Sequence, residues 1–295
     1  AMYHAKEQGR GNYQFFSADM NVRAVRRLNM ETALRRALER GELELHFQPQ
    51  VTVATGALVG AEALLRWRGH DHGSVSPSEF IPVAEETGII HEIGTWAMES
   101  ACRQIAAWQA DGLGVPKISV NLSRAQLRAG FDELLRKAMQ DADISPSALE
   151  LEITESLIMQ DENAALAILE RIGALGVRIA IDDFGAGYSS LGVLRRLPID
   201  TLKIDQSFVH DLETKPDALA VAGAIVAMAH SLKLTVVAEG VERRETLAAL
   251  AALRCDEYQG FLFSAPLPAA EFARRFLRAA VPPYPVRKPG GSLSG

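Results

Sequence analysis

The sequence predicts an α/β fold in which strands and helices alternate to form a TIM-type (β/α)8 barrel. Apolar, β-branched runs such as residues 177–181 alternate with segments of helical spacing from residue 42 to residue 279. About eight such strands over about 250 residues favour a barrel over an open, doubly wound sheet. Polar groups end nearly every predicted strand, which is typical of a barrel because its functional groups come from the carboxyl ends of several strands. An open sheet would place a ligand at one crevice only.

Composition narrows the class of protein. The 295 residues are 48% hydrophobic and 23% charged, which suits a globular protein with a large core. The net charge is −6 and no Lys/Arg-rich block stands out, which argues against binding to duplex nucleic acid. Cys102 and Cys255 are isolated, so the sequence predicts neither a disulfide framework nor a CxxC metal site, and a reduced, cytoplasmic setting fits. It contains no run typical of a transmembrane helix or a signal peptide.

The first residues look like the end of another domain. Residues 1–16 (AMYHAKEQGRGNYQFF) predict the end of a helix, a glycine turn and a short aromatic strand, too little to bury a core. A charged helical connector follows at residues 17–40, with Met30, Leu34 and Leu38 at helical spacing. Because the chain begins at Ala1 rather than at methionine, we expect it to be a piece of a longer protein.

The predicted barrel occupies residues 41–280. We expect strands at residues 42–53, 58–67, 117–122, 149–154, 177–181, 201–205, 235–239 and 258–263. We expect helices at residues 76–108 with interruptions, from 123 onward, and at 162–175, 191–197, 218–232, 245–253 and 270–279. Capping-box patterns open the first two helices, Ser76 with Glu79 and Ser123 with Gln126, and Pro77 suits a first helical position. The Pro/Gly/Ser-rich tail, residues 281–295, predicts disorder.

Polar side chains at the predicted strand ends are the candidate functional groups. They are Glu62, Asn121, Glu152 with Glu155, Asp182 with Asp183, Lys203 with Asp205, Glu239 with Glu242, and Gln259. Each of these taken alone is better explained as a solvated strand end, and Asp182-Asp183 alone as a solvated turn. If the barrel closes, however, so many acids in one mouth would repel one another without cations. The donors are oxygens, with no paired His or Cys, which favours Mg²⁺ or Mn²⁺ over Zn²⁺.

The same pattern indicates chemistry on a phosphoryl group. A two-metal carboxylate site commonly activates water and clamps a phosphoryl group. Lys203 lies two positions before Asp205, on the same strand face, where it could hold the attacking water, neutralise developing charge or simply balance its acidic neighbours. Arg66 lies four positions after Glu62, and its planar guanidinium suits a pair of phosphate oxygens.

Several sequence blocks, in order, match one known family. They are FQPQV from Phe47, EALLRW from Glu62, VNLS from Val120, ELEITES from Glu150, DDFGAGYSS from Asp182, LKIDQSFV from Leu202, VAEGVE from Val237 and YQGFLFSAPLP from Tyr258. Over residues 29–280 the chain resembles bacterial EAL domains, the cyclic-di-GMP phosphodiesterases. Residues 1–16 resemble the end of a GGDEF (diguanylate cyclase) domain, which suggests a tandem GGDEF–EAL parent protein.

The resemblance implies a modified (β/α)8 barrel whose first strand is antiparallel. It implies hydrolysis of cyclic-di-GMP to linear pGpG with two Mg²⁺ or Mn²⁺ ions per site. By motif, the first metal would be held by Glu62, Asn121, Glu152 and Asp182, and the second by Asp182 and Asp183. Lys203 would position the water, Glu239 would be a metal ligand or the general base, and Gln259 would bond within the same network. Glu155 would brace the loop after Asp183, and Asp205 and Glu242 would support the ligands.

The remaining expectations concern substrate, partners and activity. By resemblance, the nucleotide pocket would be lined by Gln48, Leu64, Arg66 and Pro266, and the chain would form a homodimer through the barrel near the helix after Ser190. Upstream GGDEF and sensory domains, and a membrane anchor in the parent protein, are further expectations. Ala186 and Arg243 replace threonines common in the family, and neither change removes a ligand. The alternative function is a weak or inactive cyclic-di-GMP receptor, although such receptors usually lack a metal acid and this sequence retains them all.

Overall fold

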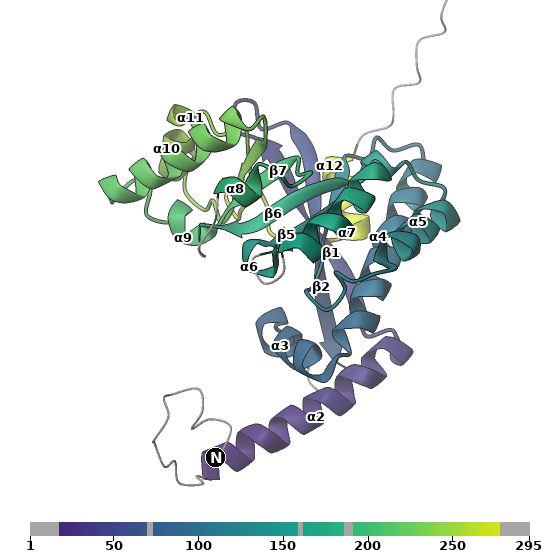
Figure 1. Ribbon diagram of the computed structural model, residues 1–295. Coiled ribbons are helices and arrows are strands. Elements are labelled where there is room, and N and C mark those ends of the chain that lie inside the picture. The colour runs from purple at the N-terminus through teal and green to yellow at the C-terminus, as the bar shows by residue number, and fades with distance from the viewer. Residues whose placement is uncertain (1–17, 70–72, 159–161, 186–190, 278–295) are drawn as a thin grey trace, which may run out of the picture.

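The computed structural model describes residues 18–69, 73–158, 162–185 and 191–277, and its centre is a closed barrel (Figure 1). Within these residues ten strands form one sheet, and eight of them close into a ring because β1 pairs with both β2 and β9. In ring order the eight are β1 (Leu43–Thr52), β2 (Leu58–Gly69), β4 (Lys117–Asn121), β5 (Leu149–Thr154), β6 (Arg178–Phe184), β7 (Thr201–Ile204), β8 (Thr235–Ala238) and β9 (Glu257–Tyr258). The predicted TIM-type barrel is therefore confirmed.

Strand β1 runs against its neighbours, as the resemblance implied. It is antiparallel to β2 on one side and to β9 on the other, whereas the pairs from β2 to β9 around the rest of the ring are parallel. The short connection to β2 explains this, because a tight turn can join only antiparallel strands. In that turn the Thr52 amide donates to the Ala57 carbonyl, and Gly56 adopts a left-handed φ of 67°. Two short strands, β3 (Gly73–Val75) and β10 (Leu267–Pro268), extend the sheet outside the ring.

Helices connect the parallel strands and cover the barrel. They are α2 (Ala18–Arg40), α3 (Pro77–Thr87), α4 (Ile90–Ala110), α5 (Phe131–Ala142), the 3₁₀ turn η1 (Pro146–Ala148), α6 (Glu155–Ile158), α7 (Glu162–Ala174), α8 (Leu191–Leu194), α9 (Gln206–Val209), α10 (Pro216–Ser231), α11 (Arg244–Ala252) and α12 (Ala269–Phe276). Figure 1 shows α2 extending from the barrel beside α3, and α10 and α11 at the far side. The predicted domain remnant at 1–16 and the tail at 281–295 lie outside the described residues, and the division into domains stays a prediction.

The helix predicted from Ser123 onward begins later. Gln126 Oε1 does accept hydrogen bonds from the Ser123 amide, at 3.2 Å, and hydroxyl, at 2.9 Å, but α5 starts only at Phe131. Gly130, with a left-handed φ of 87°, precedes that start. The Gln126 side chain packs on Gly94 of α4, where an added Cβ would lie 2.2 Å from its Oε1. This tertiary contact uses the glutamine in a loop rather than in a helix.

Two other local predictions are wrong. Helix α3 begins after Ser76 with Pro77 at its start, but Ser76 makes no side-chain capping bond and its hydroxyl lies 2.8 Å from that of Ser78. The strand predicted at 258–263 ends at Tyr258. Its continuation turns across the loop after β8, since the Leu262 amide donates to the Val241 carbonyl at 3.0 Å. Gly260 permits that crossing, because a Cβ there would lie 2.1 Å from the Val241 oxygen.

A second hydrophobic core anchors the C-terminal half of α2. Buried side chains from α2, β2, α3 and α4 form it separately from the main barrel core. Leu34 and Ala37 of α2 are fully buried, and Trp67 meets Phe80 edge-on at 5.6 Å between ring centroids. The connector helix is therefore packed against the barrel rather than loosely tethered over this part.

The barrel interior is charged near its amino-terminal end. Glu150 of β5 is 1% exposed and accepts hydrogen bonds from Lys117 and Ser119 of β4, Arg178 of β6 and Thr201 of β7. Burial raises the pKa of Glu150, but the Lys117 ammonium and these hydrogen bonds outweigh it and hold the pKa below its usual value. TIM barrels are more often filled with branched apolar side chains. Here paired charges fill the base, so the acids at the other end have a polar layer beneath them.

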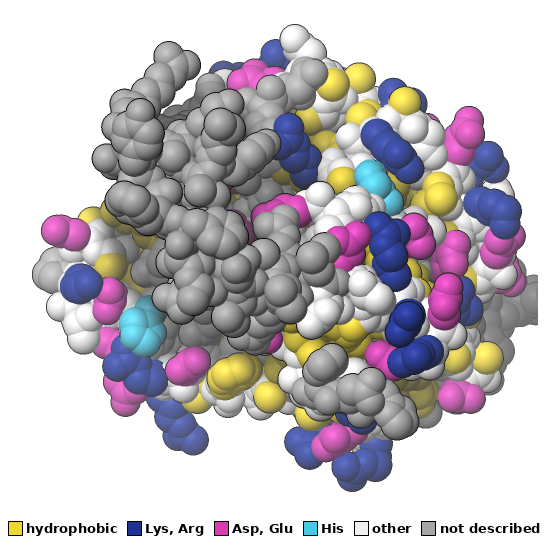
Figure 2. All heavy atoms as spheres, turned by 90° about the horizontal axis from the view of Figure 1, so that it is seen from below, with side chains coloured by type: hydrophobic (Ala, Val, Ile, Leu, Met, Phe, Trp, Pro, Cys, Tyr) yellow, Lys and Arg dark blue, Asp and Glu magenta, His cyan; other side chains and the backbone are white. Residues whose placement is uncertain are grey.

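The described surface mixes charges. On the face shown in Figure 2, basic and acidic side chains are interspersed among the residues drawn in colour. No helix within the described ranges is long and apolar enough to cross a membrane.

Candidate metal and substrate site

The predicted polar side chains converge at the carboxyl ends of the barrel strands. Glu62 lies on β2, Asn121 on β4, Glu152 on β5, Asp182 and Asp183 on β6, and Lys203 on β7, while Glu239 and Gln259 directly follow β8 and β9. Hydrogen bonds and ion pairs link this set across the barrel. The Asn121 amide donates to Glu62 Oε1 at 2.7 Å, and the Gln259 amide donates to Glu62 Oε2 at 2.6 Å. The convergence therefore brings into contact residues that are far apart in sequence.

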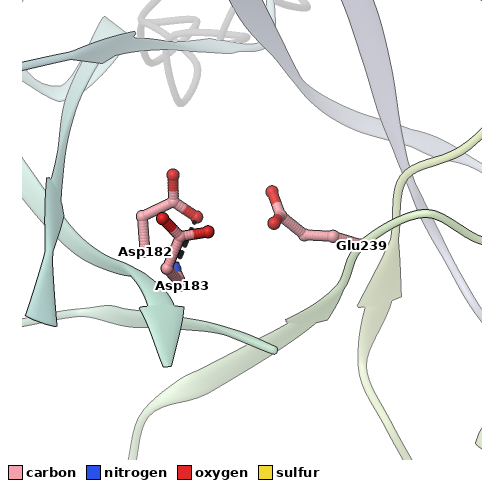
Figure 3. A group of neighbouring side chains, drawn as sticks. All are labelled: Asp182, Asp183 and Glu239. Atoms are coloured by element: carbon pink, nitrogen blue, oxygen red, sulfur yellow. Dashed lines mark hydrogen bonds between the residues drawn. The ribbon is translucent and has the colours of Figure 1, made fainter. Parts of the chain in front are cut away.

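Asp182 and Asp183 point to the same side although they are neighbours on a strand. Asp183 has a left-handed φ of 55°, and the pairing of β6 with β7 shifts register between Ile181 and Phe184. This break in the pleat turns the second carboxylate next to the first, and the Asp183 amide donates to Asp182 Oδ1 at 3.0 Å. Figure 3 shows both carboxylates together, with Glu239 pointing toward them from across the mouth. The sequence had left a solvated turn as an alternative, and the geometry favours a shared site.

The Lys203 ammonium lies at the centre of the acids. Its Nζ is 2.6 Å from Glu152, 2.6 Å from Glu239, 3.2 Å from Asp182 and 3.4 Å from Glu62. The side chain is 1% exposed. Burial lowers the pKa of Lys203, but the acids outweigh it and raise the pKa well above its ordinary value. Lys203 is therefore a fixed positive charge in this site.

One ammonium does not neutralise the acids around it. Burial raises the pKa of Glu152 well above its ordinary value, and the charge of Glu62 adds to the effect. Burial also raises the pKa of Glu239, to about 8, against the opposing effect of Lys203. Glu62 differs: burial raises its pKa, but Lys203 and the hydrogen bonds from Gln259 and Asn121 outweigh burial and hold the pKa low. The excess negative charge is relieved by protonation unless another cation binds.

The residues present fit a divalent cation. Ligand oxygens of Asp182, Asp183 and Glu239 lie within 4.8 Å of one another. Burial, followed by the charges of Asp182 and Asp205, raises the pKa of Asp183. Oε1 of Glu152 is buried and has no hydrogen-bond partner within the described residues, which leaves an oxygen available as a ligand. Carboxylate and amide oxygens are the donors that Mg²⁺ and Mn²⁺ prefer.

Three further predicted residues have different surroundings. Glu155 is buried, and its Oε2 accepts a hydrogen bond from the Gly185 amide at 3.1 Å, directly after β6. Asp205 caps α9, since its Oδ1 accepts from the Ser207 amide at 3.0 Å. Glu242 is exposed. The supporting roles predicted for these residues stay predictions. The exposure of Glu242 fits such a role least well, because a side chain that supports the ligands is expected to be buried.

A pocket of about 490 Å³ lies beside the acids. Asn121, which bonds Glu62, is one of its lining residues, as are the predicted substrate residues Leu64 and Arg66. Its other walls are largely apolar and come from α3, α4 and the segments after β4 and β5. Gln48 and Pro266 do not line it. Gln48 instead bonds Gln259, whose Nε2 donates to Gln48 Oε1 at 3.0 Å.

Two parts of this region carry no clear signal in the sequence. The apolar pocket walls, including Ile81, Ile90 and Ala97, carry no signal except helical spacing and could not be assigned to a site. Gln50 is buried in the barrel and bonds Gln259, a contact that was not predicted. The period of two along β1 could have found it, because Gln48 and Gln50 lie on the same face.

The chain is thus a TIM-type barrel that has a cluster of acidic side chains at its mouth. The family model described as the EAL domain matches residues 31–266. The chain therefore belongs to the EAL domain family.

Individual relatives agree with this assignment. The chain is 47% identical over 272 residues to the bifunctional diguanylate cyclase/cyclic di-GMP phosphodiesterase MucR of Pseudomonas aeruginosa, covering 92% of this chain and 40% of MucR. It is 43% identical over 287 residues to the cyclic di-GMP phosphodiesterase NbdA of the same species, covering 96% of this chain and 37% of NbdA. A solved structure of the PaMucR phosphodiesterase in its c-di-GMP complex matches with a TM-score of 0.80 and 46% identity, covering 83% of this chain and 99% of that one. The chain spans about two fifths of the length of these curated relatives.

Proposed function

We propose that this chain hydrolyses one phosphodiester bond of cyclic-di-GMP, giving linear pGpG, with Mg²⁺ or Mn²⁺ as cofactor. The observation that carries the proposal is the buried Lys203 ammonium held by four carboxylates next to the Asp182–Asp183 pair. That arrangement combines a fixed positive charge with oxygen ligands in excess, which suits phosphoryl chemistry. The names of MucR and NbdA support the choice of substrate.

In this proposal the acids hold two metal ions. Glu62, Asn121, Glu152 and Asp182 would hold the first, and Asp182 and Asp183 would hold the second. When bound, the ions supply an activated water and a clamp on the phosphate oxygens. Lys203 orients the attacking water, and Gln259 donates its amide to Glu62 within the same network. Glu239, whose pKa is raised to about 8, serves either as a ligand or as the base that takes the proton from water.

The nucleotide occupies the mouth and the neighbouring pocket. The pocket of about 490 Å³ with apolar walls suits a flat guanine base, and Leu64 lies on its wall. Arg66 lines the same pocket, half-buried, where its guanidinium can meet a phosphate. Gln48 and Pro266 contact the other half of the dinucleotide.

Turnover with a matched variant tests the proposal. Purified protein is incubated with cyclic-di-GMP and either Mg²⁺ or Mn²⁺, and pGpG is followed by chromatography. We expect the wild type to form pGpG and Glu62→Ala to form none, because the variant loses a ligand at the first metal. Chelation with EDTA should stop the wild type as well. Binding of cyclic-di-GMP without turnover in either metal would instead establish the receptor function, and activity retained in Glu62→Ala would refute the ligand assignment.

The context of the domain is also proposed. The chain works in the cytoplasm as the C-terminal part of a longer regulator, with GGDEF and sensory domains upstream and α2 as the connection. The buried half of α2 shares a core with α3 and β2, and these two elements also line the pocket. A displacement of α2 would therefore be transmitted to the pocket wall. We further propose a homodimer through the barrel near α8, which sedimentation of the purified chain would detect.

A further inference from the structure

Three buried glutamines form a directional chain of hydrogen bonds beside the acids. Gln50 Nε2 donates to Gln259 Oε1 at 3.1 Å. Gln259 Nε2 donates both to Gln48 Oε1 at 3.0 Å and to Glu62 Oε2 at 2.6 Å. Gln48 Nε2 in turn donates to the Ser264 carbonyl at 3.2 Å.

The two acceptors at the far ends set the direction of this chain. A carboxylate and a backbone carbonyl can only accept, so Glu62 requires a donor from Gln259, and Ser264 requires one from Gln48. With its nitrogen committed to Gln48 and Glu62, Gln259 must present its oxygen to the other side. Gln50 supplies the donor there. A reversed Gln259 would place its oxygen against the Glu62 carboxylate, which is repulsive.

Gln50 is buried with only part of its hydrogen-bonding capacity used. It is 1% exposed, and its Oε1 has no hydrogen-bond partner among the residues the structure describes. A buried amide left partly unpaired costs stability relative to an apolar side chain. Within the described residues, the only hydrogen bond of the Gln50 side chain is the one it donates to Gln259, so this amide acts on Gln259 alone.

Gly60 provides the space for this side chain. Gly60 is the direct partner of Gln50 across the β1–β2 pair, and a Cβ on it would lie 2.5 Å from Gln50 Oε1. A side chain on residue 60 would therefore displace the Gln50 amide without changing its chemistry.

We propose that Gln50 is a positioning residue that holds the Gln259 amide with its nitrogen toward Glu62, and so prepares Glu62 to bind metal. The inference rests on the proposed function, in which Glu62 is a metal ligand. Partners that orient a metal ligand from outside the coordination sphere commonly change metal affinity by about 10- to 100-fold when they are removed.

The test is a double-mutant cycle in Mn²⁺ affinity, measured by calorimetry on the wild type, Gln50→Met, Gln259→Met and the double variant. Methionine keeps the length of the side chain and removes the donor. We expect Gln50→Met to weaken Mn²⁺ binding about 10-fold in the wild type and to have no further effect once Gln259 is replaced. An equal weakening in both backgrounds, or none in either, would overturn the inference.

Two more variants separate positioning from general damage. Gly60→Ala should reproduce the loss of affinity and the dependence on Gln259, and it covers the case in which Gln50→Met fails to fold. Thr201→Val is the matched control, because it removes a buried hydrogen bond to Glu150 at the opposite end of the barrel. Its effect on Mn²⁺ affinity should simply add to that of Gln259→Met.

A metal-free measurement distinguishes failure of this inference from failure of the proposed function. In protein labelled with ¹⁵N-glutamine, the Gln259 side-chain amide should give one set of signals, protected from exchange with water, and lose that protection in Gln50→Met. If the wild type binds no Mn²⁺, the metal assignment fails while this measurement still decides the orientation of Gln259. Unchanged Gln259 signals in Gln50→Met would refute the inference.

Discussion

Lys203 balances the charge of the site at the scale of single residues. Its ammonium contacts Glu62, Glu152, Asp182 and Glu239, all within 3.4 Å. Removing one partner of a buried ion pair leaves an uncompensated charge, which typically costs about 3–5 kcal/mol. We therefore expect Lys203→Met to lower the free energy of unfolding of the metal-free protein by at least about 3 kcal/mol and to abolish turnover.

Added metal should restore part of this loss. Because a divalent cation can take over the neutralisation, Mg²⁺ or Mn²⁺ should raise the melting temperature of Lys203→Met by more than that of the wild type. The control is Lys137→Met, which breaks a surface ion pair with Asp141. It should leave the melting temperature unchanged both without metal and with metal. Equal stabilisation of Lys203→Met and the wild type by metal would contradict this prediction.

Glu239 should make the stability of the metal-free protein fall as the pH rises. Its pKa is about 8 in the folded protein against 4.5 ordinarily, so between these values the folded state binds more protons than the unfolded state. The stabilisation due to Glu239 is complete below pH 4.5 and is lost as the pH passes 8. We therefore expect urea unfolding across this pH window to show the free energy of unfolding of the wild type falling relative to that of Glu239→Gln. A constant difference would contradict the raised pKa.

At the scale of elements, α2 is part of the barrel domain through its last turns. Leu34 of α2 is fully buried in the core that this helix shares with α3 and β2. Truncating a buried leucine to alanine typically costs about 2–5 kcal/mol. We expect Leu34→Ala to destabilise the domain by this amount in urea unfolding, whereas Arg36→Ala, at an exposed position of the same helix, should have little effect. A negligible effect of Leu34→Ala would show that α2 is not coupled to the barrel.

The elements also show where local sequence signals succeed. Strand β5 (Leu149–Thr154) begins and ends as predicted, with the 3₁₀ turn Pro146–Ala148 directly before it and helix α6 directly after it. The helix expected from Ser123 is wrong, since Gln126 is drawn onto Gly94 of α4. The strand expected to reach Phe263 ends early because the chain must cross the Val241 backbone. Local patterns thus predict an element well unless its residues make a tertiary contact that requires a different backbone conformation.

At the scale of the whole molecule, the barrel makes one site from distant segments. Lys203 and Glu62 are 141 residues apart in sequence, and Gln259 and Glu62 are 197 apart. Closure through the β1 pairings is what brings them within hydrogen-bonding distance. The charged layer around Glu150 lies in the same interior, so the barrel is polar at its base as well as at its mouth.

Local patterns along the chain are enough to predict the alternation of strands and helices and the residue types at the strand ends. They therefore predict a barrel with an oxygen-rich mouth, because period-two and helical spacing are local and strand ends in a barrel must converge. The folded chain was needed to show that Lys203 lies among four acids, that Asp183 turns beside Asp182, and that Gln50 faces Gln259. These facts depend on the register and closure of strands far apart in the chain, and no local pattern encodes them.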